Sequence, residues 1–241
     1  MINTQHLASG RPTWGRRIAV ALVRAWLTLR YRVLSRRYGR LTLEMIDGVP
    51  LIVLPQVFNP VLLRTGAFLA RAITRLPLGD ASTPTVLDMG TGSGVGAVFA
   101  ARRGARVIAV DINAAAVRCA RINALLNHLD DRIEVRHGDL FAPVAGQKFD
   151  LVLFNPPFFR GAPSDNLDHA WRGLDVFERF AGGLAAMLIP DGLALLVLSS
   201  DGDCHELLDA LAAAGFQREI VEQKDLINEV LTIYAVRHTT N

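Results

Sequence analysis

The chain has 241 residues, of which 51% are hydrophobic, enough to bury the core of one large α/β domain or two smaller ones. Two widely spaced cysteines and scattered histidines argue against a disulfide framework and a metal site, and no apolar run is long enough to span a bilayer. Residues 1–43 hold nine arginines and no acid, whereas the rest of the chain holds 17 basic and 23 acidic side chains. We therefore expect a cytoplasmic protein that contains no metal and joins a basic arm, residues 1–40, to an acidic body.

The basic arm carries a helical pattern from Trp14 to about Tyr38. Apolar residues recur there at spacings of three and four, and arginines line another face. Three interpretations stay open for this segment. It is a helix packed on the main domain, an electrostatic arm (residues 11–40) that contacts nucleic acid or another acidic surface, or a helix on a membrane surface without any transmembrane segment.

Residues 41–80 form a small pre-domain. Residues 41–54 alternate loosely around Asp47-Gly48, which predicts a β-hairpin with a type I′ turn. A helix is predicted from about Leu62 to Leu76, with Asn59 or Thr65 as its cap. We expect this pre-domain to cover the open side of the ligand site described next.

Residues 81–241 alternate strands with helices after a connector, residues 77–84, that is rich in turn-forming residues. Such alternation predicts a mostly parallel sheet covered by helices on both faces. The predicted strands are residues 85–89, 106–111, 133–137, 149–154, 193–199, 216–222 and 231–238. The predicted helices are residues 94–103, 114–126, 174–188 and 205–214.

The first of these strands ends in a glycine-rich turn, and residues 86–96 read VLDMGTGSGVG. A glycine turn at the carboxyl end of a parallel strand exposes bare backbone to a ligand and faces it with a helix N-terminus. The dinucleotide-binding fingerprint, G-x-G-x-x-G or A, fits poorly. Its last position falls on Val95 when it is counted from Gly90, and on Ala97 when it is counted from Gly92. Asp88, two residues before the first glycine, suits a cationic ligand better than a phosphate. A glycine turn without any ligand stays as the alternative.

Two more carboxylates follow the next two strands. Asp111 lies 21 residues after Gly90 and suits a carboxylate that accepts hydrogen bonds from the two ribose hydroxyls of a nucleoside. Its alternative role is an ordinary helix cap before Asn113. Asp139 can accept a hydrogen bond from an adenine amino group while Leu140 packs on the ring, or it is a plain turn residue after glycine.

The fourth strand ends in Phe154-Asn155-Pro156-Pro157-Phe158-Phe159. Two consecutive prolines stop the strand and stiffen the turn. The Asn155 side-chain oxygen and the Pro156 carbonyl then become fixed acceptors, which can hold both hydrogens of an NH₂ group and aim its lone pair at a methyl group. Phe158 can stack on the planar group that carries the amine, so catalysis depends mostly on positioning. The alternative is a rigid loop packed by two phenylalanines.

Together the stretches VLDMGTGSG, VDIN, GDL and NPPF resemble the class I S-adenosylmethionine-dependent methyltransferases. More narrowly they resemble the branch with an Asn-Pro-Pro-aromatic motif, which includes release-factor glutamine methyltransferases and the guanine and adenine exocyclic-amine methyltransferases of nucleic acids. The resemblance covers about residues 50–200. It implies an α/β fold with a Rossmann-like seven-stranded sheet in the order 3-2-1-4-5-7-6, the seventh strand antiparallel, preceded by a small N-terminal helical and hairpin extension.

The same resemblance assigns roles to residues. It implies S-adenosylmethionine as the cofactor and an acceptor held by Asn155, Pro156, Pro157 and Phe158. The residues that it implies at the cofactor are Asp88, Gly90, Thr91, Gly92, Gly94, Asp111, Ile112, Asp139, Leu140 and Asn155.

The resemblance leaves the methyl acceptor open. The glutamine enzymes usually carry tyrosine where this chain has Phe158, and an acidic pair where it has Leu63-Arg64-Thr65. The guanine enzymes often carry histidine where it has Phe159. We expect N-methylation of a protein amide or an RNA base amine. A small-molecule amine is one alternative acceptor, and a non-catalytic RNA-binding module is the alternative from another class.

Overall fold

The computed structural model describes residues 40–75, 83–157, 159–160, 172–173, 175–227 and 229–238. The basic arm up to residue 39 with its expected helix, residues 77–82 of the connector and the predicted site residue Phe158 lie outside these described residues. Within the described part of the chain, no helix is both long enough and apolar enough to cross a membrane.

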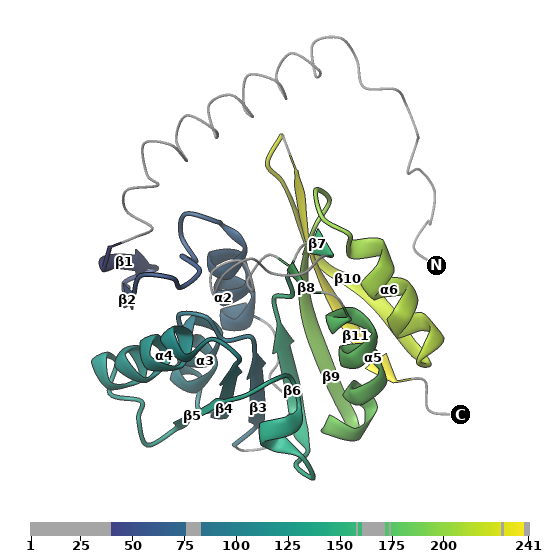
Figure 1. Ribbon diagram of the computed structural model, residues 1–241, viewed down its shortest axis with the longest axis horizontal. Helices are drawn as coiled ribbons and strands as arrows, with labels where there is room; N and C mark the ends of the chain where they lie inside the picture. The colour runs from purple at the N-terminus through teal and green to yellow at the C-terminus, as the bar shows by residue number, and fades with distance from the viewer. Residues whose placement is uncertain are drawn as a thin grey trace.

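A seven-stranded sheet forms the centre of the molecule (Figure 1). Its strands are β3 (Thr85–Met89), β4 (Arg106–Asp111), β5 (Ile133–His137), β6 (Phe149–Phe154), β9 (Leu188–Ser199), β10 (Phe216–Asp225) and β11 (Val230–His238). They lie in the order β5-β4-β3-β6-β9-β11-β10, in which β11 runs antiparallel to both of its neighbours. Counted along the chain, this is the order 3-2-1-4-5-7-6, so the predicted sheet topology is confirmed. A short parallel pair lies outside this sheet and consists of β7 (Phe159–Arg160) and β8 (Arg172–Gly173).

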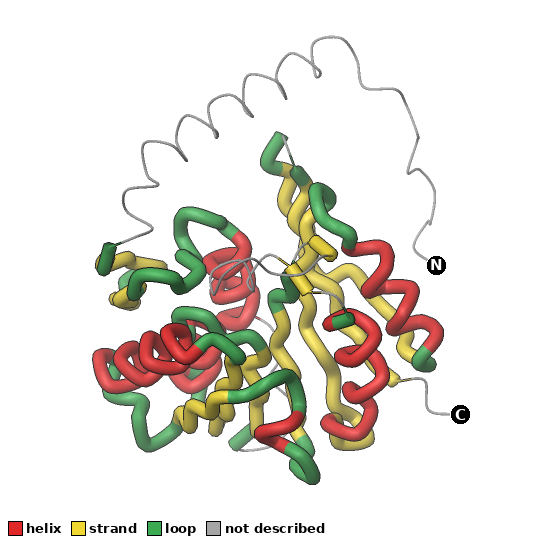
Figure 2. Tube along the Cα trace, viewed as in Figure 1, coloured by secondary structure: helices red, strands yellow, loops and turns green. Residues whose placement is uncertain are grey.

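Helices cover both faces of the sheet, as the red tubes on either side of the yellow strands show (Figure 2). The helices are α2 (Thr65–Arg75), α3 (Val95–Arg102), α4 (Ala114–Leu126), α5 (Val176–Met187) and α6 (Cys204–Ala213), with a 3₁₀ turn at Ala142–Val144. In β6, Leu151 and Leu153 pack with α2, α3 and α4, whereas Val152 and Phe154 pack with α5 and α6. Since successive side chains of a strand point to opposite faces, the apolar run at residues 151–154 serves both cores.

The predicted hairpin precedes the sheet as β1 (Thr42–Ile46) and β2 (Val49–Val53). Asp47 and Gly48 have φ angles of 49° and 82°, both positive, as a type I′ turn requires. The buried face of the hairpin, which includes Leu51, belongs to the same hydrophobic cluster as α2 and α3. The pre-domain therefore shares one core with the sheet.

Helix α4 closes the free edge of β2 through one buried amide. The Asn123 side chain accepts a hydrogen bond from the Ile52 N–H and donates to the Ile52 carbonyl, both at 2.7 Å. It also donates to the carbonyl of Ser93 at 2.7 Å, and Asn127 donates to Pro50 at 3.0 Å. A fully buried side chain thus ties β2, α4 and the glycine turn together.

Helix α2 begins at Thr65, three residues later than predicted. The Asn59 Oδ1 atom accepts hydrogen bonds from the N–H groups of Val61 and Leu62, which forms a separate turn before the helix. The Nδ2 atom of Asn59 donates to Glu44 at 2.8 Å and so holds this turn against β1. Hydrogen bonds from these N–H groups to the Asn59 side chain therefore form a turn at residues where a helix was expected, and the helix begins only after it.

Strand β9 is longer than predicted. Its proline, aspartate and glycine at residues 190–192 indicate a turn, yet Phe149 already pairs with Leu188 before them. The ladder resumes where Leu151 pairs with Leu193, with a register shift in between. The turn-forming residues therefore occupy an irregularity within the strand.

Candidate functional site

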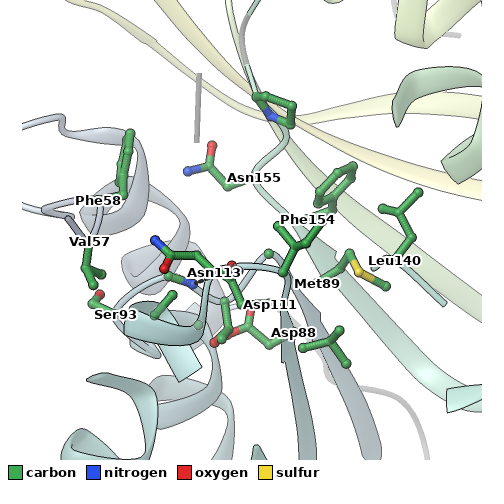
Figure 3. A pocket seen from close by; sticks show the side chains of 18 of the residues that line it. Val57, Phe58, Asp88, Met89, Ser93, Asp111, Asn113, Leu140, Phe154 and Asn155 are labelled. Carbon is green, nitrogen blue, oxygen red and sulfur yellow. Dashed lines mark hydrogen bonds between the residues drawn. The ribbon is translucent and has the colours of Figure 1, made fainter. Parts of the chain in front are cut away.

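The carboxyl ends of β3, β4 and β6 meet around a cavity of about 310 Å³. Met89 and Phe154 are register partners in neighbouring parallel strands, so Gly90 and Asn155, the next residues, leave the sheet side by side. In Figure 3, Asp88 and Asp111 lie close together at the bottom of the view and Asn155 lies above them. The glycine turn and the Asn-Pro-Pro corner are thus two walls of one cavity.

Most of the predicted site residues line this cavity. Gly94 and Pro156 are not among the residues that line it. Those that do are Asp88, Gly90, Thr91, Gly92, Asp111, Ile112, Asp139, Leu140, Asn155 and Pro157.

Two glycines of the turn serve different purposes. Gly92 has a φ of 56°, and a Cβ atom there would meet only the Phe58 side chain and the Gly90 carbonyl, both about 4 Å away, so its need is conformational. Gly94 has a φ of 81°, and its Cβ would lie 2.9 Å from the Cα of Ala120 in α4. Gly94 is the N-terminal cap of α3 and packs against a helix, which explains its place outside the cavity.

Asp88 is buried beneath the turn. Its Oδ2 atom accepts hydrogen bonds from the Thr91 hydroxyl at 2.5 Å and from the Ala97 N–H at 2.8 Å. Burial raises its pKa from 3.8 to about 6, an effect that these two hydrogen bonds oppose and the nearby Asp111 reinforces. A Cβ atom on Gly96 would lie 2.6 Å from this carboxylate, so α3 can pass close to it only because residue 96 is glycine.

Asp111 uses both of its carboxylate oxygens at the end of β4. Its Oδ2 atom accepts from the Gly92 N–H and its Oδ1 atom from the Asn113 N–H, each at 2.8 Å. Asn113, rather than Asp111, caps α4, since its side chain accepts from the Ala115 N–H at 2.9 Å. The Asn113 side chain also donates to the carbonyl of Gln56, which joins the pre-domain to this edge of the sheet.

Asp139 lies at the exposed rim of the cavity. Its carboxylate pairs with the Arg179 guanidinium at 2.6 Å, and the same guanidinium lies 3.5 Å from Asp175. The Asp139 carboxylate raises the pKa of Arg179, since the hydrogen bond favours the charged guanidinium. Such half-exposed ion pairs contribute little to stability, but this one connects the loop after β5 to α5.

Asn155 presents an unpaired acceptor. Its Nδ2 atom donates to the Thr65 hydroxyl at 3.3 Å, whereas its buried Oδ1 atom has no hydrogen-bond partner among the described residues. Ser93, which also lines the cavity, has a buried hydroxyl that likewise has no hydrogen-bond partner among the described residues. Buried polar atoms are seldom left unpaired, so two of them in one cavity indicate a ligand that pairs with them.

Ser93 is a residue that the sequence did not assign to the site, whereas Thr65 belongs to the segment, residues 57–66, that by resemblance is expected to approach the methyl donor. Ser93 lies inside the glycine motif, where only its neighbours drew attention. Thr65 does not itself line the cavity, and it is linked to the cavity only through Asn155, 90 residues away.

The backbone of the glycine turn is not arranged for a phosphate. The N–H groups of Gly92 and Ala97 donate to carboxylates, and that of Thr91 donates to the carbonyl of Val110. A pyrophosphate needs such donors free, whereas two carboxylates below the cavity attract a positive charge. The arrangement therefore suits a cationic nucleoside next to an acceptor group for an amine.

The chain is similar to several known proteins. The family model for the methyltransferase small domain matches residues 54–225. A protein assigned as a protein N5-glutamine methyltransferase in Methanocaldococcus jannaschii is 30% identical over 202 residues, which cover 80% of this chain and 98% of that protein. The release factor glutamine methyltransferase of Moorella thermoacetica is 37% identical over 131 residues, 48% of this chain and 46% of that enzyme.

A solved structure shows the same likeness. The T. thermophilus 16S rRNA N2 G1207 methyltransferase, in complex with AdoMet and guanosine, matches with a TM-score of 0.62 and 25% identity. The match covers 83% of this chain and 50% of that one. The chain thus spans about half of the release-factor relative and of this structure, but nearly the whole of the M. jannaschii relative.

Proposed function

The chain belongs to the methyltransferase small domain family, and we propose that it transfers a methyl group at this cavity to a planar nitrogen of a protein or an RNA. It is an enzyme, an N-methyltransferase that depends on S-adenosylmethionine. The observation that supports the reaction best is the buried, unpaired Oδ1 atom of Asn155, which shares one cavity with a glycine turn backed by two carboxylates.

The residues present fit the cofactor. Asp111 would accept from the ribose hydroxyls, Asp139 and Leu140 would hold the adenine, and the turn from Gly90 to Gly92 would face the methionine part. Asp88 and Asp111 place negative charge near the sulfonium and amino groups. When bound, S-adenosylmethionine supplies an electrophilic methyl group, whose bonding electron pair stays with the sulfur as a neutral thioether.

The Asn-Pro-Pro corner holds the amine that is methylated. The Asn155 Oδ1 atom would accept one hydrogen of the NH₂ group. The Pro156 carbonyl would accept the other only if it turned toward the cavity, because Pro156 is not among the residues that line it. Together they would direct the nitrogen lone pair at the methyl carbon. The nitrogen forms its bond to the methyl group and releases a proton to water as or after the methyl arrives. The site therefore needs fixed acceptors rather than a strong base.

Among possible acceptors, a glutamine amide of a protein is favoured. The relative that this chain matches over 98% of the relative's length is assigned as a protein N5-glutamine methyltransferase. The amide of glutamine is planar and offers the two hydrogens that the corner can accept. An RNA base amine has the same shape, and the experiment below separates the two.

Labelled methyl transfer identifies the acceptor. The full-length protein is incubated with methyl-labelled S-adenosylmethionine and a cell extract separated into protein, RNA and small molecules. We expect label in the protein fraction and N5-methylglutamine after its digestion. Label in RNA would identify a base amine as the acceptor, and label in small molecules would identify a metabolite. No label in any fraction would contradict the reaction.

Calorimetry tests the cofactor site independently. The Asp111→Ala variant should weaken binding of S-adenosylmethionine strongly, because it removes the carboxylate beside the turn. Asp209→Ala, which removes an exposed carboxylate on α6, is the control and should bind as the wild type does. No binding by the wild type at millimolar S-adenosylmethionine would contradict the proposal.

A further inference from the structure

The side-chain amide of Asn155 has two possible orientations, and only one of them suits an amine. An amide carries two hydrogens on nitrogen and two lone pairs on oxygen. With the oxygen in the cavity, Asn155 accepts from an NH₂ group. With the nitrogen there, two donors would face each other, and the hydrogen bond that holds the amine would be lost.

Thr65 anchors one end of this amide, although a hydroxyl can donate as well as accept and so does not by itself select the orientation. Its hydroxyl oxygen is 3.3 Å from the Nδ2 atom of Asn155, and Thr65 is only 1% exposed. With Nδ2 occupied in this way, the remaining Oδ1 atom is the buried and unpaired one. In the described structure, Oδ1 is therefore the end of the amide that is left for another donor.

The position of Thr65 is itself constrained on both sides along the chain. Arg64, just before it, has a φ of 64° and forms an ion pair with Glu229 at 3.2 Å. Gly66, just after it, lies so close to Pro60 that a Cβ atom would be 2.6 Å from the proline Cβ. Packing and an ion pair therefore hold the Thr65 hydroxyl in place at the start of α2.

We propose that Thr65 is a positioning residue, which accepts the Asn155 Nδ2–H hydrogen bond and thereby holds the side chain of Asn155 in place at the cavity wall. This inference rests on the proposed function, since it specifies how the acceptor amine is held. Thr65 acts through Asn155 and does not itself contact the reacting atoms. The role requires a hydroxyl at residue 65, so serine preserves it and valine, which has nearly the shape of threonine, abolishes it.

Kinetics of matched variants test the role. In Thr65→Val we expect kcat to fall by about 10- to 100-fold with the fraction labelled by the wild type as acceptor, as happens when a supporting residue releases a catalytic group. Thr65→Ser should retain kcat, and S-adenosylhomocysteine should bind all variants equally by calorimetry. Thr74→Val is the control, because the exposed Thr74 hydroxyl in the same helix bonds only to the Arg71 carbonyl.

A double-mutant cycle shows whether Thr65 acts through Asn155. If it does, Thr65→Val has no further effect on kcat in the Asn155→Ala background. Losses that multiply would mean that Thr65 acts independently and would overturn the inference. A Thr65→Ser variant as slow as Thr65→Val would overturn it too, because packing rather than the hydroxyl would then matter.

Nuclear magnetic resonance gives a readout that needs no acceptor. The NH₂ resonances of Asn155 in the ¹⁵N-labelled full chain are identified by their absence in Asn155→Ala. We expect Thr65→Val to shift them and speed their hydrogen exchange, and Thr65→Ser to keep them. Unchanged resonances in Thr65→Val would overturn the inference, whereas the expected shift in a protein that labels no fraction would overturn the proposed function alone.

Discussion

The two walls of the cavity differ in how their polar groups are paired. On the glycine-turn side, Asp88 accepts two hydrogen bonds and Asp111 uses both oxygens, all with groups of the chain itself. On the Asn-Pro-Pro side, the Asn155 Oδ1 atom is buried without a partner in the described structure. The carboxylates of the first wall are thus paired within the chain, although the Ser93 hydroxyl in the turn is not, whereas the acceptor of the second wall is left for a ligand.

Because of this difference, we expect the loss of a side chain to have different effects on the two walls. Carboxylates that hold the glycine turn belong to the fold, so their loss should reduce stability and cofactor affinity together. An unpaired buried acceptor costs about 1–3 kcal/mol, so its loss should leave the fold intact and remove turnover. The variants below test that separation, beginning with the largest expected effect.

Asn155→Ala should lower kcat by about 10²- to 10³-fold, the usual loss when one fixed hydrogen-bonding group is removed from a transition state. Calorimetry with S-adenosylhomocysteine should give nearly the wild-type affinity. The melting temperature should fall only slightly, because the variant loses the Nδ2 hydrogen bond to Thr65 but also removes a buried oxygen without a partner. Cofactor binding that disappears together with turnover would show that the two walls are not separate.

Gly96→Ala should destabilise the fold by about 1–3 kcal/mol through overpacking, because its Cβ meets the Asp88 carboxylate at 2.6 Å. Gly182→Ala in α5 is a matched control, since its Cβ meets nothing within 4 Å and should add about 0.5–1 kcal/mol of helix stability. Urea unfolding of both variants measures the difference. Equal stabilities would mean that the turn has room to relax around Asp88.

The same division explains what the sequence could predict. Strand β3 falls on its predicted residues because a short, mostly apolar segment followed by turn residues is a local signal of a buried parallel strand. Asp88, Asp111 and Asn155 also stand in local motifs. The contact between Asn155 and Thr65 spans 90 residues, and no local pattern encodes such a pair.

The pH dependence of cofactor binding should follow Asp88. Burial raises its pKa from 3.8 to about 6, so the folded chain holds this proton more tightly than the unfolded chain does, and the stability from this group is lost as the pH rises through 6. A cationic ligand prefers the ionised carboxylate, so affinity for S-adenosylmethionine should change in the opposite direction, rising about tenfold between pH 5 and pH 7. Calorimetry of Asp88→Asn should give a flat profile, and a slope equal to that of the wild type would assign the titration to another group.

The smallest effect is expected at the rim, where Asp139 is paired with Arg179. Arg179→Ala should cost less than about 1 kcal/mol of stability, because both side chains are about 44% and 43% exposed and water screens the pair. If Asp139 accepts a hydrogen bond from adenine, the guanidinium competes with the cofactor. The variant should then bind S-adenosylhomocysteine more tightly, by about two- to fivefold, which is the equivalent of one surface ion pair. Weaker binding would instead mean that Arg179, which lines the cavity, contacts the cofactor directly and that the rim belongs with the glycine-turn wall.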